Sequence, residues 1–349
     1  MLKIDLRSDT VTHPTREMRK AMYEAELGDD VYGDDPTTNA LQEEAAELLG
    51  KEAALLVASG TQGNLVSLLS WATRGDEVLV GDQSHIFLNE AGGASALGGL
   101  VLYPIQTNQD GFFSEDVISQ SIKPRDYHKA PSKLLCLENT HNSTSGRVLI
   151  PNEIDSMVSV AKNHEMNVHM DGARLFNAVV YLGINPIEML STIDSVTFCL
   201  SKGLSCPIGS IVAGDKDFID RANRWRKMLG SGMRQVGVIA AAGRVAIRTM
   251  IQRLEEDHVN AKKLAYGLAN ISGLTIDADR IQTNIVRFQV PTGKGGIITE
   301  QLYDSGIYVN KGVDDLRMVT HRSISNEDID FTLLSMEKIM GLVIAGNDR

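Results

Sequence analysis

The stretch C-L-S-K-G-L-S-C-P-I-G-S, residues 199–210, is the most informative part of the chain because it places Lys202 just after an apolar run that is expected to form a strand. An apolar run of β-forming residues, 195–200, precedes the lysine, and a turn rich in glycine and proline, 203–209, follows it. Such a strand delivers an ammonium group into a glycine-lined cleft, where desolvation lowers the pKa of a lysine and makes its amine nucleophilic. A solvated lysine at a strand end is the alternative.

A second strand supplies an acidic partner for Lys202. The sequence N-V-H-M-D-G-A-R (167–174) reads as a short apolar strand that ends in Asp171, with Arg174 three residues later. A carboxylate at one strand end and a lysine at another suit a cofactor with a pyridine nitrogen, because the carboxylate keeps that nitrogen protonated. The pair therefore indicates an enzyme that uses pyridoxal 5'-phosphate (PLP).

The chain closely resembles the low-specificity L-threonine aldolases, which belong to the aspartate aminotransferase superfamily and to fold type I of the PLP enzymes. The resemblance runs almost end to end, from R-S-D-T-V-T (7–12) to L-R-M-V-T-H (316–321). It implies an α/β fold whose large domain is built on a mostly parallel seven-stranded sheet, followed by a small C-terminal α+β domain. We expect the N-terminal segment and the large domain to occupy 1–245 and the small domain 246–349.

The order of apolar patterns along the chain favours the same architecture. Short β-forming runs alternate with amphipathic helical patterns, which is typical of a mostly parallel sheet covered by helices on both faces. A long helical region from 236 to 270 is expected to link the domains, and I-V-R-F-Q-V (285–290) to form a strand of the small one. The strands expected in the large sheet are 54–58, 77–80, 100–105, 134–137, 167–170, 195–200 and 210–213.

Composition excludes several classes of partner. The 349 residues are 43% hydrophobic and 23% charged, enough for one large core and a smaller domain. A net charge of −11 argues against nucleic acid or an anionic membrane as a partner. The N-terminus lacks the apolar core of a signal peptide, and no apolar run approaches the roughly 20 residues of a membrane span. Three cysteines without a C-x-x-C pair fit reduced thiols, so we expect a cytoplasmic protein.

The phosphate site is expected at S-G-T-Q-G-N (59–64), which follows one strand and opens a helix. Backbone N–H groups at a helix N-terminus bind a phosphate dianion, and glycine permits close approach. The pattern is weak alone, because many strand-to-helix turns contain Ser, Gly and Thr. The resemblance implies that Gly60 and Thr61 supply the amides.

Two histidines are implied in the chemistry. His85, in D-Q-S-H (82–85), matches the histidine that stacks on the pyridine ring, and His141, in E-N-T-H-N (138–142), is assigned near the β-hydroxyl of the substrate. Histidine suits proton transfer near neutral pH, although a bound water could be the base. Similar aldolases usually have an aromatic residue after this histidine, within an H-x-x-x-x-E-like pattern; here the stretch is H-I-F-L-N-E (85–90), with Phe87 inside it and Asn89 next to Glu90.

Arginines are expected to decide which bond of the substrate breaks. PLP activates the Cα substituent that stands perpendicular to the ring, so a carboxylate clamped in the plane is kept and the Cα–Cβ bond is exposed. Arg offers two parallel donors for that clamp, although a surface ion pair is the more frequent fate of an arginine. The resemblance assigns the clamp to Arg174 and Arg317, helped by Ser8.

Two further residues imply a shared active site. Arg234, in G-S-G-M-R-Q (230–235), matches an element that reaches the cofactor phosphate of a neighbouring subunit, and Tyr32, in V-Y-G-D-D-P (31–36), is expected to line the cleft. We therefore expect a homodimer or homotetramer. No Cys/His set has the spacing of a metal site, and a structural cation near 7–12 is left open.

The expected reaction is retro-aldol cleavage of L-threonine, L-allo-threonine and other β-hydroxy-α-amino acids to glycine and an aldehyde. The nearest alternative is another reaction on the same scaffold, racemisation or β-elimination, because a fold does not set its chemistry. A non-catalytic PLP-binding protein is a second alternative, but it would lack the lysine or the carboxylate clamp.

Overall fold

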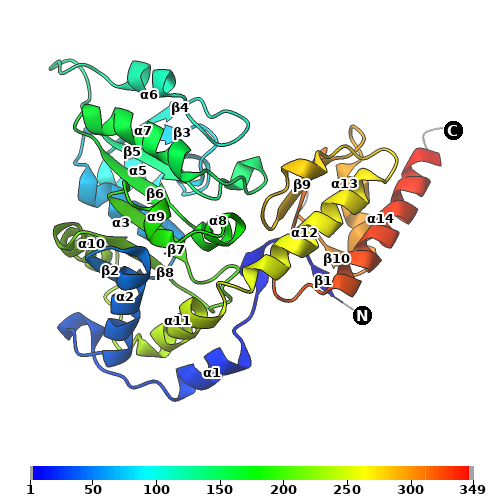
Figure 1. Cartoon of the computed structure of the whole chain (residues 1–349), viewed down its shortest axis with the longest axis horizontal. Helices are drawn as coiled ribbons and strands as arrows, with labels where there is room; N and C mark the ends of the chain where they lie inside the picture. Colours follow the sequence, from blue (N-terminus) through cyan, green and yellow to red (C-terminus); the bar gives the residue numbers. More distant parts are fainter. Residues whose placement is uncertain (1–2, 311, 346–349) are drawn as a thin grey trace.

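The computed structural model describes residues 3–310 and 312–345 and shows two units of unequal size joined by the start of α12 (Leu254–Ala269) (Figure 1). A seven-stranded sheet forms the centre of the large unit, and six of its strands run parallel, because only β8 is antiparallel to its two neighbours. The predicted fold class is confirmed. In spatial order the strands are β2 (Ala53–Val57), β8 (Ser210–Gly214), β7 (Ser195–Cys199), β6 (Asn167–Asp171), β5 (Ser132–Glu138), β3 (Glu77–Gly81) and β4 (Val101–Ile105).

Helices cover both faces of this sheet, which explains why its strands read as apolar runs rather than as alternating patterns. Leu56, Leu135 and Val196 belong to the core on one face, whereas Leu55 and Val212 pack on the other. The helices of the large unit are α1 (Arg16–Tyr23), α2 (Pro36–Leu49), α3 (Gly60–Trp71), α4 (His85–Leu88), α5 (Gly93–Gly98), α6 (Glu115–Ser121), α7 (Pro151–Asn163), α8 (Leu175–Leu182), α9 (Pro186–Met189), α10 (Lys216–Met228) and α11 (Gly237–Thr249), with 3-10 turns η1 (Asp9–Val11), η2 (Asp30–Tyr32) and η3 (Asn142–Thr144).

The small unit has its own hydrophobic core. Strands β9 (Ile285–Gln289) and β11 (Asp315–Val319) pair antiparallel, and β1 (Ile4–Asp5) pairs parallel with β10 (Ile307–Tyr308). Because Ile4 and Leu6 are buried in this core, residues 4–6 lie with the small unit, whereas the expected division at 245 placed them with the large one. The remaining elements are η4 (Ala278–Arg280), α13 (Gly295–Asp304) and α14 (Asn326–Ala345).

The helical region expected over 236–270 is present and consists of two helices, α11 and α12. Helix α11 packs on the large core through residues such as Ala240, and α12 packs on the small core through Leu264. The break at 250–253 thus falls where the chain passes from one core to the other.

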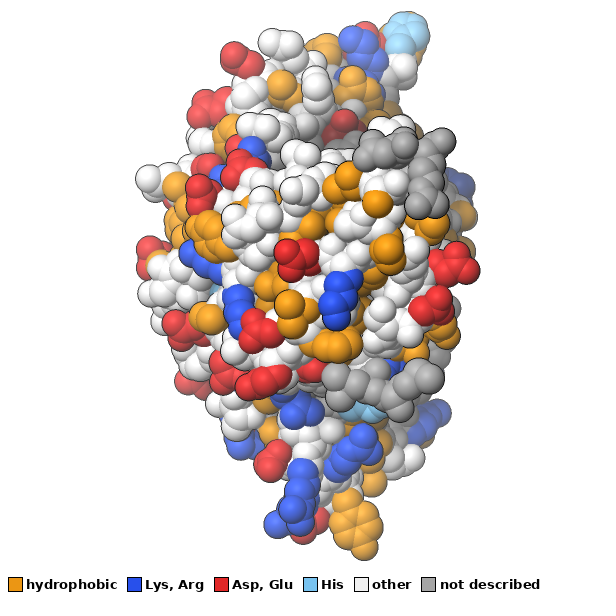
Figure 2. All heavy atoms as spheres, turned by 90° about the vertical axis from the view of Figure 1, so that its right-hand side faces the viewer, with side chains coloured by type: hydrophobic (Ala, Val, Ile, Leu, Met, Phe, Trp, Pro, Cys, Tyr) orange, Lys and Arg blue, Asp and Glu red, His pale blue; other side chains and the backbone are white. Residues whose placement is uncertain are grey.

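The surface of the small unit is mixed. Figure 2 shows hydrophobic atoms scattered among acidic, basic and other polar side chains on this face. Leu334 and Leu342 of α14 are among the exposed apolar residues. In the described part of the chain, no helix has the length and apolar character needed to cross a membrane.

The arrangement of the sheet creates one functional edge. The carboxyl ends of the parallel strands β5, β6 and β7 lie next to one another, and the N-terminus of α3 packs against the same strands. In open α/β sheets this edge is where ligands bind.

Candidate active site

Asp171 and Lys202 both lie at this edge. Asp171 is the last residue of β6 and is 2% exposed. One carboxylate oxygen accepts the N–H of Ala173 at 3.0 Å, and the other accepts Nδ2 of Asn64 at 2.8 Å. Lys202 is half-buried, three residues beyond the end of β7, and its backbone carbonyl accepts the hydroxyl of Thr12 at 2.8 Å.

The predicted phosphate site is the N-terminus of α3. Ser59 caps this helix, and its hydroxyl accepts the N–H of Gln62 at 3.1 Å. The amides of Gly60 and Thr61 have no acceptor among the described residues. A Cβ on Gly60 would lie 2.8 Å from Sγ of Cys199, so only glycine fits here without displacing its neighbour.

The residues present fit PLP. The free amides of α3 suit the phosphate group. The buried carboxylate of Asp171 suits the pyridine nitrogen, and the amine of Lys202 suits the aldehyde carbon. In addition, the hydroxyl of Ser210, on the strand next to Gly60, is buried without a hydrogen-bond partner in the described structure, as is that of Thr197. Buried polar atoms of this kind need a partner, which a ligand can supply.

Arg174 has a partner that the sequence did not reveal. Its Nε and Nη2 each donate to a carboxylate oxygen of Asp9 at 2.7 Å, and both side chains are buried. Asp9 also accepts Nδ2 of Asn284, from the small unit, at 3.1 Å. Asp9 is wholly buried, yet the charges of Arg174 and Lys202 hold the pKa of its carboxyl far below the ordinary value. The bidentate edge of Arg174 is therefore engaged inside the protein, and Nη1 is the remaining donor.

Arg317, by contrast, has no carboxylate partner among the described residues. Its Nη1 donates to Oδ1 of Asn142 at 3.0 Å, and its Nη2 donates to the carbonyl of Arg7 at 3.2 Å. Burial, and then the nearby charge of Arg174, lower the pKa of Arg317 to about 10. Nη1 of Arg174 also points to Oδ1 of Asn142, at 3.5 Å. Two guanidinium groups thus converge on one oxygen, an arrangement that attracts a carboxylate.

The two predicted histidines have different surroundings. Nδ1 of His85 lies 2.9 Å from Oε1 of Glu90, and this hydrogen bond is the main reason that the pKa of His85 is raised. His141 is 2% exposed, its Nδ1 lies 3.2 Å from the hydroxyl of Thr144, and its ring packs against Gly111.

The expected position of His141 near the β-hydroxyl of the substrate stays a prediction, and the structure places its ring next to the residue that contacts both arginines. Within the described residues, no hydrogen bond connects its side chain to Asp171, Lys202 or Arg317. The next residue, Asn142, contacts both arginines instead.

The other predicted residues lie near the edge or apart from it. Ser8 caps η1, next to Asp9, and its hydroxyl accepts the N–H of Thr10 at 3.2 Å. Arg234 and Tyr32 form a separate exposed pair, in which the guanidinium lies 6.0 Å from the ring centre and Nη1 is 3.0 Å from Asp29. No hydrogen bond or ion pair in the described chain joins this pair to Lys202.

Sequence reasoning missed Asp9, Asn64 and Asn142, although each lies inside a stretch that it singled out. Short motifs identified the segments that reach the site. They could not show which side chains within a segment face the cluster, because that depends on the turn adopted by each loop.

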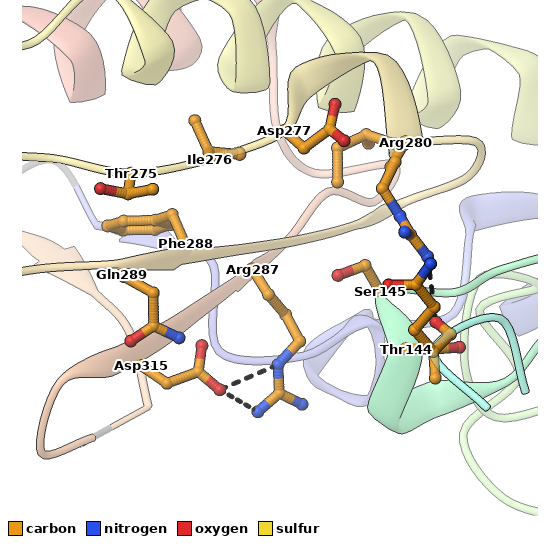
Figure 3. Close-up of a pocket in the computed structure, with 12 residues that line it drawn as sticks. Thr144, Ser145, Thr275, Ile276, Asp277, Arg280, Arg287, Phe288, Gln289 and Asp315 are labelled. Carbon is orange, nitrogen blue, oxygen red and sulfur yellow. Dashed lines mark hydrogen bonds and ion pairs between the residues drawn. The ribbon is translucent and has the colours of Figure 1, made fainter. Parts of the chain in front are cut away.

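A cavity of about 320 Å³ with a mixed polar and apolar lining lies between η3 and the small unit. Figure 3 shows Thr144 and Ser145 on one side, with Arg287 paired to Asp315 on the other. Arg280 likewise pairs with Asp110, at 2.6 Å. Because both arginines are already neutralised, the cavity lacks a free cation, and we place the reacting groups at the sheet edge instead.

Comparisons with known proteins agree with this geometry. The family model described as beta-eliminating lyase matches residues 5–291. The chain is 46% identical over 326 residues to the low specificity L-threonine aldolase of Escherichia coli (strain K12), covering 93% of this chain and 96% of that protein. It is 44% identical over 343 residues to the probable low-specificity L-threonine aldolase 2 of Arabidopsis thaliana, with 96% and 97% covered.

A solved structure shows the same fold. The threonine aldolase of Leishmania major superimposes with a TM-score of 0.82 at 18% identity, covering 97% of this chain and 99% of that one. The architecture is fold type I of the PLP-dependent enzymes. The chain belongs to the beta-eliminating lyase family and, within it, to the low-specificity L-threonine aldolases.

Proposed function

We propose that this protein is a PLP-dependent lyase that cleaves L-threonine, L-allo-threonine and other β-hydroxy-α-amino acids into glycine and an aldehyde. The observation that carries the proposal is Arg317, a partly buried cation without an acidic partner in the described residues, beside the Asp171 and Lys202 edge. Such a cation is best satisfied by the carboxylate of an amino acid. The curated relatives named threonine aldolases support this substrate class.

Gly60 and Thr61 would hold the phosphate of PLP, Asp171 the pyridine nitrogen and Lys202 the aldehyde carbon. When bound, PLP supplies an electron sink for the charge that develops at Cα of the substrate. Asp171 is suited to this task because its two oxygens are fixed by Ala173 and Asn64, which keeps the carboxylate aimed at one position.

The protein side chains choose the bond that breaks. Arg317 and Nη1 of Arg174, with Ser8 close by, would hold the substrate carboxylate at a fixed position. The carboxylate then stays, and the bond between Cα and Cβ is the one exposed to cleavage. The reaction removes a proton from the β-hydroxyl, releases the aldehyde and adds a proton at Cα. We assign delivery of that last proton to Lys202.

The test is the product formed from L-threonine. Purified protein with PLP is expected to give equimolar acetaldehyde and glycine, measured by coupled reduction of acetaldehyde and by amino-acid analysis. Formation of 2-oxobutyrate would indicate β-elimination, and formation of D-threonine would indicate racemisation. Either as the main product overturns the proposal.

We also propose that the enzyme is a cytoplasmic homodimer or homotetramer with shared active sites, which degrades threonine and supplies glycine. The exposed pair of Arg234 and Tyr32 supports this assembly, because both residues lie apart from the cluster of their own subunit. Light scattering on the purified protein tests it, and a monomer at micromolar concentration would contradict it.

A further inference from the structure

A group of polar residues around Asp171 includes Glu90, a buried acid to which the proposed reaction assigns no role. Nδ2 of Asn64, on α3, donates to Asp171 at 2.8 Å and to Oε1 of Glu90 at 2.7 Å. The same oxygen of Glu90 lies 2.9 Å from Nδ1 of His85. One atom from each of His85, Glu90 and Asp171 lies within 4.8 Å of the other two. The imidazole therefore faces two carboxylates held by one amide nitrogen.

His169 fixes the orientation of the Asn64 amide. It is wholly buried, and burial lowers its pKa to about 4, so it is neutral at pH 7. Its Nε2 lies 3.2 Å from Oδ1 of Asn64, and its Nδ1 lies 2.9 Å from the hydroxyl of Ser195, which accepts Nε1 of Trp71 at 2.8 Å. Because Oδ1 of Asn64 can only accept, Nε2 carries the proton and donates to it, and Nδ1 of the neutral ring accepts the hydroxyl of Ser195. Only the amide nitrogen of Asn64 is then left for the carboxylates.

Glu90 is the unusual member of this group. Its side chain is 7% exposed, and burial, followed by the charge of Asp171, raises the pKa of its carboxyl. A buried carboxylate next to another needs a cation or a proton nearby. His85 is the group that can supply it, since its Nδ1 faces Glu90 directly. The pKa of His85 is raised in agreement with this, through Glu90 first and Asp171 next, against burial and the charge of Lys202.

We propose that Glu90 is a positioning residue that accepts Nδ1–H of His85, fixes the imidazole beside Asp171 and keeps it cationic. This proposal rests on the proposed function. In that reaction, a cation held against bound PLP would stabilise the negative charge that develops on the substrate. A second glutamate holds the backbone of His85, whose N–H donates to Glu138 at 2.7 Å. Backbone and side chain of His85 are then each fixed by one glutamate.

The direct test is the titration of His85 in protein free of PLP, followed by NMR of labelled histidines and assigned by the signal lost in His85→Phe. The midpoint in the parent protein is expected above 6.5. In Glu90→Gln it is expected to fall by about one pH unit or more, a tenfold loss of proton affinity. Glu44→Gln is the matched control. Glu44, on α2, also forms ion pairs, but its partners are Arg244 and Arg248 of α11 and not His85.

A second variant keeps the test decisive if Glu90→Gln does not fold. Glu90→Asp keeps the charge and withdraws it by one methylene, so the midpoint is expected between those of the parent and Glu90→Gln. A second readout is the affinity for PLP, measured by absorbance titration, which should weaken about tenfold in Glu90→Gln. An unchanged His85 midpoint in a folded Glu90 variant overturns the proposal. These readouts do not require threonine cleavage, so they stand apart from the test of the proposed function.

Discussion

At the scale of single residues, the site contrasts two arginines that the sequence treated alike. Arg174 has Nε and Nη2 engaged by Asp9, while Arg317 is desolvated and holds only neutral oxygens. A buried ion pair such as that of Arg174 and Asp9 contributes little net stability but fixes geometry. An unpaired, partly buried guanidinium costs stability and is available to a ligand. We therefore expect Arg317 to contribute most of the binding energy for the substrate carboxylate.

Arg317→Ala should lower kcat/KM for L-threonine about 100-fold or more, because it removes a charged hydrogen-bond donor from a partly buried carboxylate site. The affinity for PLP should change little. Arg322→Ala is the control, since Arg322 is exposed and contacts only the carbonyl of His13. Initial rates of acetaldehyde formation give the comparison. A decrease of less than threefold for Arg317→Ala would show that another residue holds the carboxylate.

Lys202→Ala should abolish both turnover and the visible absorbance of protein-bound PLP, because the variant lacks the amine to which PLP would be attached. Lys216→Ala, at an exposed position at the start of α10, should behave as the parent enzyme. Spectra and acetaldehyde assays on the same preparations make the measurement. Turnover retained by the Lys202 variant would refute its assignment as the PLP lysine.

At the scale of elements, the sequence predicts where strands lie and where helices begin. It does not predict which elements pack together or which distant side chains pair. Strand β7 is predicted by its apolar run, and the start of α3 is predicted by Ser59 and Gly60, because both features are local in the sequence. The break between α11 and α12 carries no glycine or proline and arises from packing on two cores. The pairing of Asp9 with Arg174 spans 165 positions, so no local pattern could reveal it. The contact of the His141 ring with Gly111 is likewise set by the turn of its loop and not by a local pattern.

The N-terminus of α3 gives a prediction about close packing. Gly60→Ala should weaken PLP binding about tenfold, because the added Cβ meets Cys199 and displaces the amides from the phosphate. Gly341→Ala in α14 is the matched control. Its Cβ meets nothing within 4 Å, so the variant should bind PLP normally and gain up to about 1 kcal/mol of stability. Equal PLP affinity in both variants would exclude a phosphate contact at Gly60.

The burial of two histidines predicts how the free energy of unfolding depends on pH. Burial lowers the pKa of His169 on β6 and of His258 on α12 to about 4 each. Between about pH 6.5 and pH 4 the unfolded chain therefore binds more protons at these sites, so their contribution to stability is lost as pH falls. Asp257, whose pKa burial raises to about 6, acts in the opposite direction.

Substitution of His258 isolates this effect. Between pH 7 and pH 5, His258→Gln should lose about 1 to 2 kcal/mol less of its free energy of unfolding than the parent protein does. The exposed His164 is the control, and His164→Gln should follow the parent. Urea denaturation of PLP-free protein at both pH values gives the numbers. The same pH dependence in all three proteins would mean that His258 is not buried neutral.

At the scale of the whole molecule, the exposed pair of Arg234 and Tyr32 is the feature that a single subunit leaves unexplained. Arg234 is held by Asp29 and lies over Tyr32, so its position is defined, yet 52% of its side chain is exposed. An exposed, oriented guanidinium on a segment next to the site of its own chain is suited to reach a phosphate across a two-fold interface. The N-terminal end of the same segment contacts α3, because Ser231 accepts Nε2 of Gln62 at 2.7 Å.

Shared sites predict complementation between two inactive variants. Lys202→Ala lacks the attachment amine, and Arg234→Ala would lack the phosphate contact given to its partner, so each alone should have little activity. Hybrid dimers formed by unfolding and refolding a mixture contain one site built only from intact residues. Random pairing makes half of the dimers hybrids, so about one quarter of parental activity should return.

Mixing the same variants without unfolding is the control, because subunits that stay in their original assemblies form no hybrid site and should remain inactive. A mixture of Lys202→Ala with Asp171→Ala, two residues of the same subunit's site, should recover nothing after refolding, since every hybrid site then carries one of the two defects. If the Lys202 and Arg234 pair also recovers nothing while Arg234→Ala is itself inactive, Arg234 acts within its own subunit. Recovery near one quarter in the first mixture alone places Arg234 in the site of the neighbouring copy, which makes assembly a condition for catalysis.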